Sequence, residues 1–161
     1  MTQANAIECV AFRPGWESEL ARFFDALDAA GDRAFFHPHR GDEATLSTLS
    51  RNIGADLHYL LVQDRDVLAY GLLRGWDAGY AIPSLGIAVH PSSRAGGLGR
   101  LMMDYLEAMA RHRGASAVRL RVHKDNSRAR DLYVLRGYQM TTDDDDERLM
   151  VGLKTLGSGV A

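Results

Sequence analysis

The stretch Ile87-Ala88-Val89-His90-Pro91-Ser92-Ser93-Arg94-Ala95-Gly96-Gly97-Leu98-Gly99-Arg100 joins an apolar run, a proline and a cluster of glycines. The apolar run is typical of a buried strand, and the His-Pro pair disfavours regular structure, so we expect the strand to end at Val89. Apolar residues then recur at helical spacing, at Leu98, Leu101, Met102, Tyr105, Leu106 and Met109. This spacing predicts a helix from about Leu98 to Arg113 that packs on a sheet.

The loop between this strand and this helix is suited to an anion. Glycine allows backbone conformations and close approach that a side chain would block, so successive amide groups can converge on one ligand. The start of a helix adds unpaired N–H groups and the positive end of its dipole. The loop therefore predicts a phosphate or diphosphate site, with Arg94 or Arg100 able to add charge-assisted bonds. The alternative is a glycine-rich turn that only lets the chain enter the helix.

Two common phosphate motifs do not match the loop. No Gly-Lys-Ser/Thr sequence follows the glycines, and the spacing Gly97-Leu98-Gly99 continues to Met102, where a dinucleotide fold has a third small residue. Nucleoside triphosphates and nicotinamide cofactors are therefore disfavoured.

The rest of the chain alternates between strand and helix signals without a linker or a repeat, which predicts a single domain over residues 1–161. Strands that follow a hairpin and then alternate with helices predict an α/β sheet of mixed direction. The expected strands are 7–13, 57–63, 67–74, 85–89, 118–122, 138–141 and 149–153, and the other expected helices are 16–31, 44–53 and 126–136. We interpret the acidic turn from Asp143 to Asp146 as a solvated hairpin tip and assign it no site.

Composition indicates a soluble folded protein and excludes some partners. Apolar residues make up 46% of the 161 residues and charged residues 25%. A net charge of −2 gives no general reason to bind nucleic acid or an anionic membrane. The single cysteine, Cys9, cannot form an internal disulfide, and neither a targeting segment nor a membrane span is apparent, so we predict a cytoplasmic protein.

Two motifs make the interpretation more specific. Arg94-x-x-Gly97-x-Gly99 resembles the pyrophosphate-binding motif of GNAT acetyltransferases, and Asn126-Ser127-Arg128-Ala129-Arg130-Asp131-Leu132-Tyr133 followed by Gly137-Tyr138 resembles a second motif of that family. The resemblance covers about residues 85–138. It implies an α/β (α+β) fold with a mixed, mostly antiparallel sheet of six to seven strands, a splayed central pair and about four helices. It also implies an N-acetyltransferase that uses acetyl-CoA as cosubstrate.

The same resemblance implies roles for individual residues. Coenzyme A would contact Ile87, Ala88, Val89, Arg94, Ala95, Gly96, Gly97, Leu98, Gly99, Arg100, Asn126, Ala129 and Tyr133. The backbone N–H of Val89 would stabilise the oxyanion, and Tyr133 would act as general acid toward the departing sulfur. Asn126 is equally suited to cap its helix, and the spacing of Tyr133 is also that of a core aromatic residue.

The general base and the acceptor are less determined. Many relatives carry a glutamate on the strand that corresponds to 83–89, and this chain has none there. The candidates are His37, His39 and Asp77, with a water relay as an alternative. We expect no metal, because the two histidines lack further ligands at a recognisable spacing.

Aromatic and polar residues in the segments around Phe36 and Trp76 are typical of a ligand pocket. Their Phe-His-Pro-His and Leu-Arg-Gly-Trp-Asp sequences resemble bacterial GNAT members linked to amino-sugar and surface-polysaccharide synthesis. We therefore expect a small primary amine as acceptor, with an amino sugar as the first candidate. The alternatives are a protein or peptide amine, or a catalytically silent acyl-CoA sensor. A homodimer is a candidate assembly.

Overall fold

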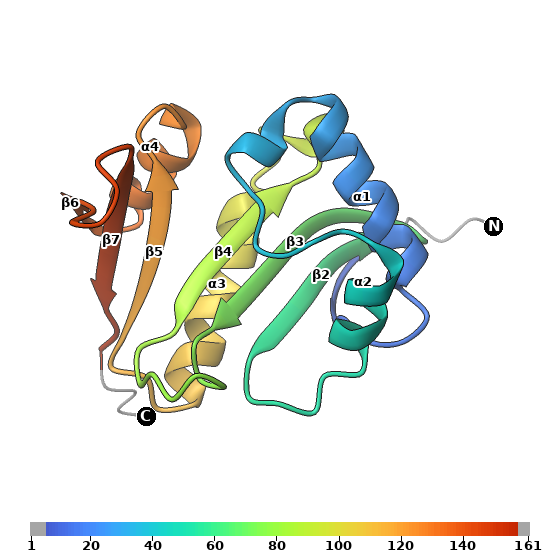
Figure 1. The fold of residues 1–161 in the computed structure, drawn as a ribbon, viewed down its shortest axis with the longest axis horizontal. Coiled ribbons are helices and arrows are strands. Elements are labelled where there is room, and N and C mark those ends of the chain that lie inside the picture. The colour runs from blue at the N-terminus through green and yellow to red at the C-terminus, as the bar shows by residue number, and fades with distance from the viewer. Residues whose placement is uncertain (1–5, 158–161) are drawn as a thin grey trace.

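The computed structural model describes residues 6–157, and its elements form one seven-stranded sheet with helices on both faces (Figure 1). The strands are β1 (Ile7–Ala11), β2 (Leu57–Gln63), β3 (Asp66–Arg74), β4 (Ser84–Val89), β5 (Ala117–His123), β6 (Gln139–Thr142) and β7 (Leu149–Thr155). The helices are α1 (Glu17–Ala29), η1 (Asp32–Ala34), α2 (Glu43–Ser50), η2 (Pro91–Ser93), α3 (Leu98–His112) and α4 (Ser127–Leu135), where η marks a 3₁₀ helix.

The strand order is β1-β2-β3-β4-β5-β7-β6, and every neighbouring pair is antiparallel except β4 and β5. That parallel pair meets at a single register position, Ser84 opposite Arg119, and the strands then diverge (Figure 1). The expected mixed, mostly antiparallel sheet with a splayed central pair is therefore confirmed. The gap opens toward the carboxyl ends of both strands, where α/β folds commonly bind ligands.

Two hydrophobic cores lie on the two faces of the sheet. Side chains of a strand alternate between faces, and in β2 this separates Tyr59 and Leu61 from Leu60 and Val62. The first pair packs with the buried face of α3, and the second packs under α1 and α2 (Figure 1). A layer of helices on each face is needed because β2 and β3 are buried on both faces.

β5 has only one buried face. Val118, Leu120 and Val122 are buried in the core with α3, whereas Arg119 and Arg121 are exposed. The helices α1 and α2 lie over β2 and β3, so they leave this arginine-bearing face of β5 uncovered (Figure 1).

Local sequence explains most of the element boundaries. Asp42, which precedes α2, accepts a hydrogen bond from the Thr45 N–H at 3.0 Å and so starts the helix one residue earlier than expected. Gly31 and Gly114 adopt φ angles of 77° and 82° just beyond α1 and α3, where a left-handed residue ends a helix. β1 ends at Ala11, two residues before the predicted end.

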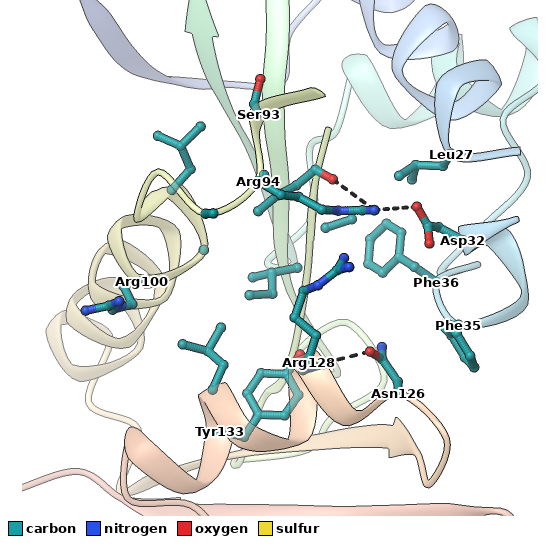
Figure 2. Close-up of a pocket in the computed structure, with 18 of the residues that line it drawn as sticks. Leu27, Asp32, Phe35, Phe36, Ser93, Arg94, Arg100, Asn126, Arg128 and Tyr133 are labelled. Atoms are coloured by element: carbon teal, nitrogen blue, oxygen red, sulfur yellow. Dashed lines mark hydrogen bonds and ion pairs between the residues drawn. The ribbon is translucent and has the colours of Figure 1, made fainter. Parts of the chain in front are cut away.

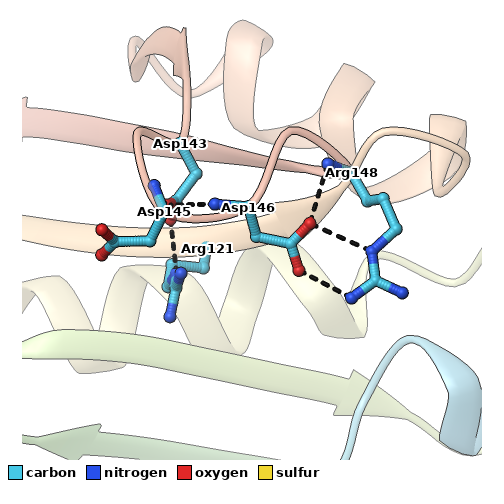
Figure 3. A network of polar contacts seen from close by, with 5 residues as sticks. All are labelled: Arg121, Asp143, Asp145, Asp146 and Arg148. Atoms are coloured by element: carbon cyan, nitrogen blue, oxygen red, sulfur yellow. Dashed lines mark hydrogen bonds and ion pairs between the residues drawn. The ribbon is translucent and has the colours of Figure 1, made fainter.

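The prediction of a solvated acidic turn is wrong for Asp143, whereas Asp144 and Asp145 are exposed as expected. Asp143 is only 7% exposed, and its carboxylate accepts hydrogen bonds from the Asp145 and Asp146 N–H groups and from Arg121 Nε at 2.7 Å (Figure 3). The carboxylate therefore organises the turn between β6 and β7, because it satisfies backbone donors and an arginine of β5 together.

Candidate active site

The loop before α3 presents unpaired backbone amides. Ala95 and Gly97 have φ angles of 65° and 85°, a left-handed conformation that turns the chain into the helix. Gly97 is the N-cap and supplies no side chain to the helix, and the Leu101 N–H is the first to bond within it, to the Gly97 carbonyl oxygen. The N–H groups at the start of α3 are therefore available to an anion.

A cavity of about 500 Å³ lies beside this helix start, between the carboxyl end of β4 and α4 (Figure 2). Its walls come from η1, the carboxyl end of β4, the loop before α3, and α4. Residues from both faces of β4 line it, Ala88 on one and Ile87 and Val89 on the other. Every residue that the sequence assigned to coenzyme A lies on this wall, except Gly96.

The charged groups of the cavity differ from the expectation. The guanidinium of Arg94 pairs with the Asp32 carboxylate and lies 3.5 Å from the Val89 carbonyl oxygen, so its charge is already compensated. Arg100 points away from the cavity, whereas Arg128 points from α4 into it (Figure 2). Within residues 6–157 Arg128 has no ion-pair partner. Arg128 was not among the residues expected to contact coenzyme A, because nothing in its local sequence distinguishes it from the other arginines of that segment, such as Arg130.

Two residues, one at the start of α4 and one within it, stabilise the fold and also line the cavity. Asn126 is the N-cap, and its side-chain oxygen accepts a hydrogen bond from the Ala129 N–H at 3.3 Å. Tyr133 is 5% exposed and packs in the core with α3, and it also lines the cavity. Burial raises the pKa of Tyr133 to about 12, so its hydroxyl keeps its proton at neutral pH.

The edge of β4 that faces the gap carries free backbone groups. The His90 N–H donates to the Leu68 carbonyl oxygen at 2.8 Å, on the β3 side. Because backbone N–H groups of an antiparallel strand alternate in direction, the Val89 and Ile87 N–H groups point to the β5 side. β5 pairs with β4 only at Ser84, so it does not occupy these donors.

A second cavity of about 460 Å³ adjoins the first along β4. Ser84, Leu85 and Gly86 line it, and Phe35 and Phe36 line both cavities. The ring of Phe35 also contacts the His123 ring of β5, with centroids 5.4 Å apart. The second cavity thus lies in the same gap, on the face that α1 and α2 leave uncovered.

The structure separates the three candidate bases. The exposed side chain of His37 lines the second cavity. His39 is engaged elsewhere, because its Nε2 lies 2.7 Å from the Tyr70 hydroxyl and its Nδ1 lies 2.8 Å from the Arg40 carbonyl oxygen. The Asp77 carboxylate accepts hydrogen bonds from the Ala55 and Asp56 N–H groups, and it lines neither cavity.

The free helix start, the open edge of β4 and the buried Tyr133 lie on one cavity, an arrangement suited to a transferase that takes its acyl group from coenzyme A. The profile of the acetyltransferase (GNAT) family matches residues 8–138, so the chain belongs to this family. It is thereby an acetyl-CoA-dependent N-acetyltransferase. No curated protein matches the chain in sequence.

Solved structures show the same fold. The GNAT domain of S. lividans PAT has a TM-score of 0.79 at 10% identity, with 93% of this chain and 90% of that chain covered. PaiA N-acetyltransferase from Thermoplasma acidophilum, in complex with coenzyme A, has a TM-score of 0.75 at 14% identity, with coverage of 94% and 99%. RimL, a ribosomal L7/L12 α-N-protein acetyltransferase in complex with coenzyme A, has a TM-score of 0.77 at 11% identity, with 98% of each chain covered.

No three His, Cys, Asp or Glu side chains among residues 6–157 are grouped so that they could hold a metal ion. None of the helices in that range combines the length and the apolar character that crossing a bilayer requires.

Proposed function

We propose that the chain transfers an acetyl group from acetyl-CoA, bound in the first cavity, to the primary amine of a small molecule bound in the second. The observation that carries this proposal is the junction of the two cavities along β4, where Phe35 and Phe36 line both, with the free helix start and Tyr133 on the wall of the first. The helix start and the Arg128 guanidinium would hold the phosphates of the carrier. The open edge of β4 would bond the amide groups of its pantetheine arm.

The residues of the gap supply the groups that transfer needs. A carbon–nitrogen bond forms as the carbon–sulfur bond breaks, and the Val89 N–H would donate to the carbonyl oxygen as it gains charge. The Tyr133 hydroxyl would give a proton to the departing sulfur. His37 is the candidate base on the cavity wall, and it would take the proton that the amine nitrogen loses. Atoms and charge balance, since one proton leaves the nitrogen and one reaches the sulfur.

A small acceptor is favoured over a protein segment. The volume of about 460 Å³ lies within the usual range for small-molecule sites, and the segment that contains Phe35 and Phe36 walls it on one side. An amino sugar fits this class and remains the first candidate.

Calorimetric titration with acetyl-CoA, followed by a thiol-release assay across amino sugars, polyamines, amino acids and peptide N-termini, tests the proposal. We expect micromolar binding and turnover of at least one small amine. Tyr133→Phe should reduce kcat by about tenfold or more while it changes the Kd for acetyl-CoA by less than about threefold. Tight binding without transfer to any amine would instead favour an acyl-CoA sensor, and turnover of peptides alone would favour a protein substrate.

A further inference from the structure

Three arginines, Arg74, Arg121 and Arg148, line the second cavity, together with a single carboxylate, Asp146. An acceptor pocket that only had to admit an amine would not need cations, because they repel the protonated amine that must bind or form there. The positive lining is therefore suited to a negatively charged group elsewhere in the acceptor molecule.

Two of these arginines are compensated by carboxylates of the β6–β7 turn. Arg148 makes a two-pronged contact with Asp146, through Nε at 3.0 Å and Nη2 at 2.8 Å (Figure 3). Arg121 donates to the Asp143 carboxylate through Nε alone, so its two terminal nitrogens remain directed away from that contact (Figure 3).

Arg74 differs from both. It ends β3 beside Ser84 of β4, and its side chain lies on the cavity side of the strand with Leu72. Its Nη1 donates to the Pro38 carbonyl oxygen at 2.5 Å, and no described residue forms an ion pair with it. A guanidinium has five N–H donors, so most of those of Arg74 remain available while the contact with Pro38 fixes its position.

We infer that Arg74, with the terminal nitrogens of Arg121, binds an acidic group of the acceptor. This inference rests on the proposed function and names the substrate class: a primary amine that also carries a carboxylate or a phosphate. The planar fork of arginine matches either anion with two parallel bonds. Because the bonds anchor the far end of the molecule, they orient the amine toward the junction with the first cavity.

Matched amines that differ in the acidic group test the inference. The pairs are 4-aminobutyrate with butylamine, for a carboxylate, and glucosamine 6-phosphate with glucosamine, for a phosphate. We expect the acidic member of at least one pair to have a kcat/KM about tenfold or more above its neutral partner, and the pair that shows this identifies the anion.

Variants distinguish a role of Arg74 in binding the anion from a role in stabilising the fold. Arg74→Gln should reduce the acidic-to-neutral ratio to near one by raising KM for the acidic amine, whereas a purely structural role would lower both rates together. Arg111→Gln removes the same charge from an exposed position of α3 and should leave the ratio unchanged. If Arg74→Gln fails to fold, Arg148→Gln serves instead, because its side chain is 75% exposed and its loss leaves Asp146 unpaired at the wall, which should also lower the ratio.

Equal rates for acidic and neutral amines, or an unchanged ratio in Arg74→Gln, would overturn the inference and leave the proposed function intact. Failure to acetylate any amine would overturn both.

Discussion

Glu107 links the two halves of the sheet at the level where β4 and β5 part. It lies on α3, is 4% exposed, and its carboxylate accepts hydrogen bonds from Lys154 Nζ at 2.8 Å, Arg136 Nη2 at 3.2 Å and the Tyr138 hydroxyl at 3.2 Å. The three donors belong to β7, the end of α4 and the residue before β6. One carboxylate thus connects the helix under β3 and β4 to the half of the sheet beyond the gap.

We expect Glu107→Gln to destabilise the protein by about 3 kcal/mol. Removal of one partner from a buried ion pair costs about 3–5 kcal/mol, because the remaining charge stays poorly solvated. The lower end applies here because the Arg136 and Lys154 side chains are 19% and 23% exposed, and Arg136 keeps an ion pair with Asp104. Urea unfolding followed by circular dichroism measures the loss, with an unchanged m-value as evidence that the folded state is retained.

Asp104→Asn is the matched control. It removes the other carboxylate partner of Arg136, but the Asp104 side chain is 62% exposed, and exposed pairs contribute at most about 1 kcal/mol. A loss below 1 kcal/mol in Glu107→Gln, or one equal to that of the control, would refute the view that this carboxylate joins the halves.

Three further predictions concern pH, packing and charge. Burial lowers the pKa of His58 to about 4, so the folded protein binds this proton less readily than the unfolded chain. The free energy of unfolding should therefore fall by up to about 3 kcal/mol as the pH drops from 6.5 to 4. In urea unfolding at a series of pH values, His58→Phe should reduce this fall, and an unchanged fall would contradict the prediction. Gly71→Ala would place a Cβ 2.5 Å from Met102 Sδ, so we expect a loss of about 1–3 kcal/mol on thermal or urea unfolding, and wild-type stability would show that α3 can shift. Arg128→Gln should weaken coenzyme A binding about three- to tenfold in calorimetry and reduce the salt dependence of that binding, whereas Arg111→Gln should change neither. Equal affinities of the two variants would show that Arg128 does not bind the phosphates.

The conformation of the loop before α3 was predictable from sequence because its requirements are local. A left-handed residue such as Gly97 and an uncapped helix start depend on neighbours within a few positions, and the sequence displays them directly. The same holds for the ends of α1 and α3, where Gly31 and Gly114 follow the last turn.

Charge compensation was not predictable, because it depends on residues far apart in the chain. Arg94 was expected to bind phosphate, yet its partner Asp32 lies 62 positions earlier. Asp143 was interpreted as solvated, yet it meets Arg121 across the neighbouring strands. In both cases the fold, and not the local sequence, decided which ion pair formed.

The gap between β4 and β5 imposes opposite demands on stability and on binding. Strand pairing along this edge would satisfy the Ile87 and Val89 N–H groups, and a buried backbone donor without a partner costs about 1–3 kcal/mol. The chain does not complete the pairing, and instead stabilises the divergent halves from below, through the apolar face of α3 and the Glu107 carboxylate. The unpaired edge therefore persists as a preformed set of donors and acceptors that a ligand with amide groups can complete, and this is the physical reason to propose the site in the gap rather than on the closed part of the sheet.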